Sequence, residues 1–161
     1  MLKPNLLELL HQLREARVEF IVVGGAAAVL QGAPLTTKDL DVVYLQTEDN
    51  VSRLMNVLSA NRARIRDPAG RHLVPSKDLL LSGRQILMIT DSGPFDCLGE
   101  LHDGRKYGDL IARVDEFGDG EISILVMDLE TLIETKAEAN RPKDRMAVPI
   151  LLAVLRERQR K

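Results

Sequence analysis

Apolar residues recur along the chain at helical spacing in some segments and in short unbroken runs in others. Leucines at helical spacing follow Pro4, and Pro142 precedes a second stretch of this kind, so both prolines stand where a helix can begin. Asp128 suits the N-cap of a third helix. We expect longer helices over residues 5–16, 49–61, 128–139 and 144–158, and short helical segments over residues 26–31 and 106–111.

The unbroken apolar runs predict buried strands, because a short continuous run bounded by turn signals fits a strand in a sheet interior. Gly93 and Pro94 separate two of these runs, which indicates a hairpin. Residues 62–84 mix arginines with prolines and glycines and predict an irregular basic segment. We expect strands over residues 20–23, 39–45, 85–90, 95–98 and 121–127, so that helices alternate with about five strands in an α/β or α+β sheet.

The composition fits one globular domain over residues 1–161, because this length is close to the usual size of a single domain. The chain has no Trp, three Phe and two Tyr, so its core must be built from Leu, Val, Ile and Ala. The net charge of −2 creates no overall attraction to nucleic acid or to an anionic membrane. The basic stretch over residues 156–161 fits a solvated helix end, with a nucleic-acid contact as the alternative.

Cysteine, histidine and hydropathy restrict the class of protein further. Cys97 is the only cysteine, which excludes an intramolecular disulfide and a cysteine metal cluster. The three histidines have no ligand-like spacing, so we expect solvated or structural roles for them. The chain shows no signal peptide and no apolar run of the roughly 18 residues that a membrane span needs. We therefore expect a cytoplasmic protein with no membrane association.

The most informative stretch lies between residues 22 and 43, where two glycines precede two aspartates. Gly24 and Gly25 close one apolar run, and Asp39 and Asp41 open the next. Alternate residues of a strand point to the same face, so the two carboxylates would lie together beside the glycine turn. Buried carboxylates repel, a shared divalent cation relieves the repulsion, and a glycine turn suits a phosphate. The stretch predicts nucleotide chemistry, the alternatives being a strand-start cap for Asp39 and a bare turn for the glycines.

A third carboxylate, Asp96, stands in an otherwise apolar strand. Metal sites for phosphoryl transfer commonly take a further oxygen ligand from a neighbouring strand, so we expect Asp96 to complete the set. A simple edge-strand charge is the alternative. The arginines of the basic segment either bind a triphosphate or an acceptor nucleic acid, or belong to a solvated loop. They are Arg62, Arg64, Arg66 and Arg71.

These residues resemble the signature of the nucleotidyltransferase (DNA polymerase β-like) superfamily. Gly24-Gly25, thirteen intervening residues and Asp39-Leu-Asp41 match its glycine turn and D-x-D strand. The segment that ends at Asp96 resembles the third-carboxylate hairpin of small bacterial members, and residues 129–145 resemble their C-terminal helices. Over residues 5–155 the chain is similar to stand-alone proteins related to the AbiEii-type toxin nucleotidyltransferases. The resemblance implies a nucleotidyltransferase fold of the α/β (α+β) class, with a mixed sheet of about five strands flanked by helices.

The resemblance also implies roles for individual residues. Asp39, Asp41 and Asp96 would bind Mg²⁺ or Mn²⁺ and form the catalytic set. Gly24 and Gly25 would approach the triphosphate through their backbone N–H groups.

Two residues near the C-terminus are implied in nucleotide binding by the same resemblance. Lys136 matches a helix lysine directed at the nucleotide phosphates, although pairing with Glu134 or Glu138 explains it equally well. Asp144 matches an acid that lies either in the active site or directly behind it, although an ordinary first-turn acid after Pro142 is the alternative.

Two hypotheses follow for the function. The first is a metal-dependent nucleotidyltransferase that moves an NMP from an NTP to a hydroxyl of an unknown acceptor (RNA such as tRNA, a protein or a small molecule), with the toxin of a toxin–antitoxin pair as one setting and an antitoxin as its partner. The second is a catalytically inactive binding or regulatory module of the same fold. Relatives often carry Ser and Arg where this chain has Gly25 and Leu35, and these departures favour the second hypothesis.

Overall fold

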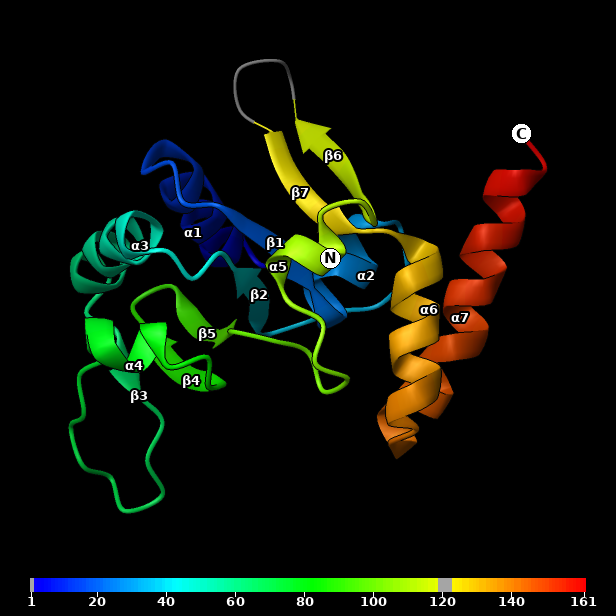
Figure 1. Ribbon diagram of the computed structural model, residues 1–161. Coiled ribbons are helices and arrows are strands. Elements are labelled where there is room, and N and C mark those ends of the chain that lie inside the picture. Colours follow the sequence, from blue (N-terminus) through cyan, green and yellow to red (C-terminus); the bar gives the residue numbers. More distant parts are fainter. Residues whose placement is uncertain (1, 119–122) are drawn as a thin grey trace.

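A mixed sheet of seven strands forms the centre of the molecule, in the spatial order β3-β4-β5-β2-β1-β7-β6 (Figure 1). The computed structural model describes residues 2–118 and 123–161. The strands are β1 (Phe20–Val23), β2 (Leu40–Tyr44), β3 (Arg64–Ile65), β4 (Ile86–Thr90), β5 (Gly93–Leu98), β6 (Val114–Gly118) and β7 (Ser123–Met127). The helices are α1 (Pro4–Glu15), α2 (Gly24–Leu30), α3 (Glu48–Ala60), α4 (Lys77–Leu81), α5 (Tyr107–Leu110), α6 (Leu129–Ala139) and α7 (Pro142–Gln159).

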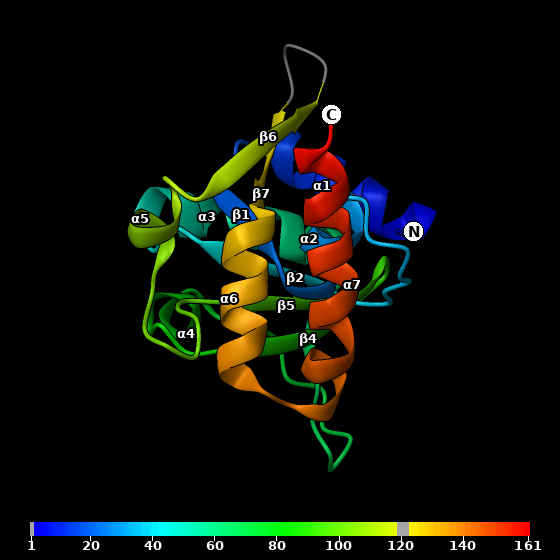
Figure 2. The ribbon, with the colours of Figure 1, turned by 90° about the vertical axis from the view of Figure 1, so that its right-hand side faces the viewer.

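The strand directions are mixed, and helices lie on both sides of the sheet. β1 is antiparallel to β2 and parallel to β7, while β2 is parallel to β5. β4 is antiparallel to both β3 and β5, and β6 is antiparallel to β7. Helices α1 and α3 lie on one side, and the adjacent helices α6 and α7 lie on the other (Figures 1 and 2). The predicted α/β (α+β) class, with a mixed sheet flanked by helices, is confirmed.

Aliphatic side chains make up most of the core, as the composition predicts, together with the buried aromatic residues Phe20, Tyr44 and Phe95. β1 is buried along its whole length. Asn50 ties α3 to the ends of the central strands, because its side chain accepts from the Glu19 N–H at 2.7 Å and donates to the Leu45 carbonyl at 2.7 Å. The residues that α1 buries are Leu6, Leu9, Leu10 and Leu13.

The expectation of about five strands is too low, because two edge strands carry no apolar run. β3 has only two residues and lies within the segment over residues 62–84 that was expected to be irregular. β6 is mostly exposed, with the polar pair Asp115 and Glu116 in its centre. Backbone pairing with β4 and β7 holds these strands in place. Helix α4 also interrupts the basic segment, where the Ser76 hydroxyl accepts from the Leu79 N–H at 3.1 Å and caps the helix.

Most predicted elements are found within a few residues of their expected ends. Helix α2 begins at Gly24, so the glycines form its first turn instead of a separate turn before residue 26. The strand expected over residues 121–127 corresponds to β7, and its expected start at residues 121–122 lies outside the described residues. Within the described part of the chain, no helix combines the length and the apolar character that crossing a membrane requires.

Candidate active site

The register of the sheet places five residues in one row across four strands and the segment that follows β3. Val23 pairs with Asp41, Asp41 with Asp96, and Asp96 with Leu87. The row continues to Arg66, whose backbone N–H donates to the Leu87 carbonyl at 2.9 Å. Directly opposed residues on neighbouring strands point to the same face, and all five line one cleft of about 1180 Å³.

Helix α6 and the start of α7 line the cleft opposite this face of the sheet. Figure 2 shows the two helices side by side in front of the sheet. Asp39, one residue before β2, lines it together with Asp41 and Asp96, so the three predicted carboxylates are brought together. The opposite wall comes from α6 and the start of α7. Its cationic side chains are Lys136, Arg141 and Lys143.

Asp41 lies in an environment that opposes its negative charge. Burial raises the pKa of Asp41 to about 7, with the charges of Asp96 and Asp39 acting in the same direction and that of Lys143 opposing them. Its buried Oδ1 atom has no hydrogen-bond partner among the described residues. A buried acceptor without a partner is unfavourable, and carboxylate oxygens are the ligands that Mg²⁺ prefers. The residues present therefore fit a divalent cation.

Arg66 forms an ion pair with Asp96, the third carboxylate of the set. Its Nη2 atom lies 2.6 Å from Oδ1 of Asp96, whose side chain is only 10% exposed. Burial raises the pKa of Asp96, and the Arg66 guanidinium counteracts part of this effect. The edge-strand alternative for Asp96 does not describe its position, because β5 lies between β4 and β2 inside the sheet.

Gly24 allows the start of α2 to lie against Asp41. Its φ angle is +64°, and a Cβ atom there would lie 2.7 Å from Oδ2 of Asp41. Gly25 lies against Thr37, where a Cβ atom would be 3.1 Å from Oγ1. The Thr37 hydroxyl in turn donates to the Asp39 carbonyl at 3.1 Å. The two glycines thus leave room for the turn and the strand that carry the aspartates.

Lys136 of α6 and Asp144 of α7 form an ion pair in which Asp144 is fully buried. The Lys136 Nζ atom lies 3.8 Å from Oδ1 of Asp144, whose side chain has no exposed area. Burial lowers the pKa of Lys136, against the opposing effect of Asp144. Among the described residues, Lys136 does not form the alternative pair with Glu134 or Glu138. Glu134 instead contacts Arg105 and Arg113, and Glu138 contacts His102.

Asp144 also fastens the start of α7. Burial favours a higher pKa for Asp144, but the hydrogen bonds from Arg141 outweigh burial and hold this pKa below its ordinary value. Its Oδ2 atom accepts from the Arg141 Nε at 2.6 Å and from the Arg141 N–H at 3.2 Å. Asp144 is therefore a first-turn acid that positions Arg141 and Lys136 at the cleft, while Lys136 itself lines it.

Three cationic residues of the cleft are not singled out by the sequence: Arg84, Arg141 and Lys143. For Arg141 and Lys143 the reason is that nothing in the periodicity shows that α7 begins beside the sheet. A lysine and an arginine that flank Pro142, close after Lys136, are the only signal that the sequence carries for them.

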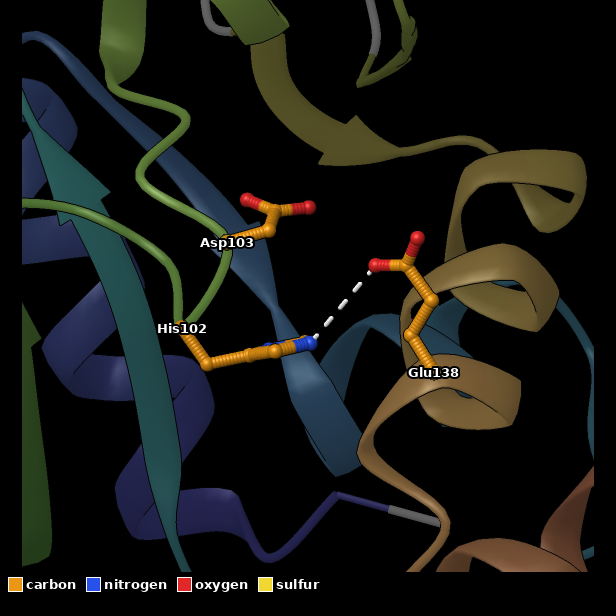
Figure 3. A group of neighbouring side chains, drawn as sticks. All are labelled: His102, Asp103 and Glu138. Atoms are coloured by element: carbon orange, nitrogen blue, oxygen red, sulfur yellow. Dashed lines mark ion pairs between the residues drawn. The ribbon is translucent and has the colours of Figure 1, made fainter.

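His102 and Glu138 also line the cleft, and together with Asp103 they form a second polar group (Figure 3). The His102 ring and the Glu138 carboxylate point toward each other, with Nε2 and Oε2 3.8 Å apart. Oxygen and nitrogen atoms of His102, Asp103 and Glu138 lie within 4.8 Å of one another, but all three residues are exposed. Arg105 engages Asp103, with Nε 2.8 Å from Oδ2. The group therefore combines an exposed histidine that contacts Glu138 with a carboxylate, Asp103, that is already paired with Arg105.

Solved structures similar to this chain identify the architecture. No protein-family model and no curated protein sequence matches it. The lincosamide antibiotic adenylyltransferase LnuA, solved with lincomycin bound, matches with a TM-score of 0.63 and 12% identity, over 94% of this chain and 97% of that one. The chain has the nucleotidyltransferase fold. The superfamily resemblance noted in the sequence agrees with this fold, whereas no finding bears on the AbiEii-type relationship.

Two further structures support the fold assignment. A Thermotoga maritima protein assigned as a nucleotidyltransferase matches with a TM-score of 0.56 and 18% identity, over 95% of this chain and 96% of that one. The enzyme ANT(2″)-Ia in complex with adenylyl-2″-tobramycin matches with a TM-score of 0.58 and 11% identity, over 93% of this chain and 87% of that one. At these identities the likeness concerns the fold, so the function must be argued from the cleft.

Proposed function

We propose that this protein is a metal-dependent nucleotidyltransferase that moves an NMP from an NTP to an acceptor hydroxyl. The observation that carries the proposal is the pairing of Asp41 with Asp96 in register, with a buried Asp41 oxygen that lacks a partner among the described residues. Asp39 supplies a third carboxylate in the same cleft. The matching fold of two adenylyltransferases supports the same chemistry.

Asp39, Asp41 and Asp96 would hold Mg²⁺ or Mn²⁺. When bound, these ions supply charge neutralisation at the nucleotide phosphates. Gly24 and Gly25 let backbone N–H groups come close to the triphosphate, and the cationic wall opposite the carboxylates attracts the same polyanion. The acceptor oxygen forms a bond to the α-phosphorus as the bond to the β-phosphate oxygen breaks, so pyrophosphate leaves and the hydroxyl proton is released.

The helical wall contributes the charges that would orient the triphosphate. Lys136 is 15% exposed and lies at the cleft, and Asp144 fixes Lys136 and Arg141 from below. Because Asp144 does not line the cleft, its proposed part in nucleotide binding is to position these two cations. Lys143 also lines the cleft, and its positive charge counteracts part of the rise in the pKa of Asp41.

A small molecule is the acceptor that we propose first. The similar structures include LnuA with lincomycin and ANT(2″)-Ia with an adenylylated tobramycin, both of which carry small-molecule acceptors. In this chain Glu100, His102 and Glu138 also line the cleft, and their side chains offer hydrogen-bond partners to a polar acceptor. We propose RNA, such as tRNA, and a protein hydroxyl as further acceptors. We also propose that the protein acts in the cytoplasm and that an antitoxin is its partner.

The contact between Arg66 and Asp96 favours a second candidate, a nucleotide-binding module without catalysis. An arginine on the third carboxylate leaves fewer oxygens for metal ions. Assays with α-³²P-labelled NTPs, Mg²⁺ or Mn²⁺, and pools of aminoglycoside, lincosamide, tRNA and protein acceptors distinguish the two. We expect labelled acceptor and pyrophosphate. Saturable NTP binding in calorimetry with no pyrophosphate release from any pool would favour the binding module and contradict the proposed enzyme.

Gly24→Ala is expected to reduce transfer at least about 100-fold, the effect of a small displacement in an active site. The added Cβ would lie 2.7 Å from Oδ2 of Asp41, so the carboxylate must move, and the φ angle of +64° adds strain. Gly32→Ala is the matched control, because its φ angle is +101° and no heavy atom lies within 4 Å of the place that its Cβ would take. Initial rates of both variants test this, and equal losses in the two would contradict the role given to the Gly24–Asp41 contact.

A further inference from the structure

The sheet register brings Arg66 into the cleft. Its backbone N–H bonds the Leu87 carbonyl at 2.9 Å, so the residue continues the β3–β4 ladder. Leu87 is paired with Asp96 across the next ladder. Neighbouring strands lie about 4.8 Å apart, so two strand spacings separate the backbone of Arg66 from that of Asp96, a span that an extended arginine side chain bridges. The contact is therefore built into the strand pairing.

The other paired arginines of the basic segment differ from Arg66 in position. Arg62 pairs with Asp91 at 2.9 Å and Arg71 with Asp67 at 2.7 Å, and neither arginine lines the cleft. Arg66 alone among these three lines it. Within the described part of the chain, Asp96 is the carboxylate that lies at ion-pair distance from Arg66.

We propose that Arg66 holds Asp96 until a divalent cation takes that carboxylate, and that Arg66 then binds the phosphates of the nucleotide. This inference rests on the proposed function. A guanidinium and a divalent cation compete for Asp96, because both are positively charged and each is stabilised by the negative charge of this one carboxylate. After its release from Asp96, Arg66 stays at the cleft because its backbone N–H remains bonded to the Leu87 carbonyl. Its guanidinium then presents N–H donors that suit a phosphate.

The exchange couples metal binding to nucleotide binding. In the metal-free cleft the charge of Arg66 is satisfied by Asp96, so it contributes little attraction to a free nucleotide. With Asp96 engaged by a cation, the same arginine becomes available to the triphosphate. Because coupling between two ligands is reciprocal, bound nucleotide would also strengthen cation binding. The chain would thus favour the metal–nucleotide complex over either component alone.

Arg66→Gln separates the two halves of the exchange, with Arg71→Gln as the matched control in the same segment. In the absence of nucleotide, we expect R66Q to bind Mn²⁺ about tenfold more tightly than the wild type, which is the lower end of the effect of one charge-assisted hydrogen bond. The electron paramagnetic resonance signal of free Mn²⁺ measures this binding. Inorganic tripolyphosphate titrated with saturating Mg²⁺ in a calorimeter is expected to bind about tenfold more weakly. R71Q should match the wild type in both titrations.

Arg66→Lys keeps the charge but loses the planar fork, so it should fall between R66Q and the wild type in both measurements. Weaker or unchanged Mn²⁺ binding in R66Q would overturn the competition, since Arg66 would then orient Asp96 or have no influence on it. Tighter Mn²⁺ binding with unchanged tripolyphosphate binding would overturn the transfer of Arg66 to phosphate. A wild-type protein that binds no Mn²⁺ removes the proposed metal-dependent function itself, and the inference with it.

Discussion

Asp41→Asn is expected to lower nucleotidyl transfer at least about a thousandfold while the protein stays folded. The amide keeps the shape of the side chain but lacks the charge that would hold a cation beside the phosphates, a contribution of several kcal/mol to transition-state stabilisation. The same change removes a buried carboxylate that Asp96 repels. The melting temperature of the metal-free protein at pH 8 should therefore equal or exceed that of the wild type. Labelled-NTP initial rates and thermal melts measure the two effects.

Asp91→Asn provides the control for this substitution. Asp91 pairs with the exposed Arg62 at 2.9 Å and does not line the cleft. Its loss should leave transfer within about twofold, because an exposed ion pair contributes little. Transfer retained by D41N would contradict the role of Asp41 as a metal ligand, and a lower melting temperature in D41N than in the wild type would contradict the repulsion argument.

The stability of the metal-free protein is expected to fall as the pH rises from about 4 to 8, through the titration of Asp41. Burial raises the pKa of Asp41 in the folded protein to about 7, above the ordinary value of 3.8. The folded state thus binds the proton more tightly, so this stabilisation is complete below the unfolded pKa and is lost as the pH passes through 7. We expect this single group to account for a change on the order of 4 kcal/mol in the free energy of unfolding.

Urea titrations of wild type and D41N at pH 5.5 and 8 isolate this contribution, because the asparagine does not titrate. The difference between the two proteins should favour the wild type more at pH 5.5 than at pH 8. Mn²⁺ at about 100 times its Kd should add about 2.7 kcal/mol to the wild type at pH 8. A pH-independent difference would show that Asp41 titrates normally, and an equal gain for D41N with Mn²⁺ would place the metal elsewhere.

The sequence alone predicts the parts of the site that lie on buried strands. The apolar runs of β1, β2 and β5 can be found from hydropathy, and the period of a strand places Asp39 and Asp41 on one face. Asp96 could be singled out because a charge in an apolar strand needs a partner. The edge strands β3 and β6 could not be found, since their side chains carry no burial signal and only backbone pairing defines them.

The packing of distant segments was beyond local patterns. Asp144 lies in the first turn of α7, and its contact with Lys136 depends on how α6 and α7 pack. Likewise, Arg66 meets Asp96 only through the register of three strands. The sequence offers arginines in the basic segment but gives no reason to prefer Arg66 over Arg71. The sequence therefore predicts the chemistry of the carboxylates better than it predicts the cations that surround them.

The parallel use of α-³²P- and γ-³²P-labelled NTP tests the central claim most directly. With Mg²⁺ or Mn²⁺ and an acceptor that supports turnover, the account predicts α-label in the acceptor, γ-label in pyrophosphate, and neither product when D41N replaces the wild type. Transfer of the γ-label to the acceptor, or full α-label transfer by D41N, would contradict nucleotidyl transfer by these carboxylates.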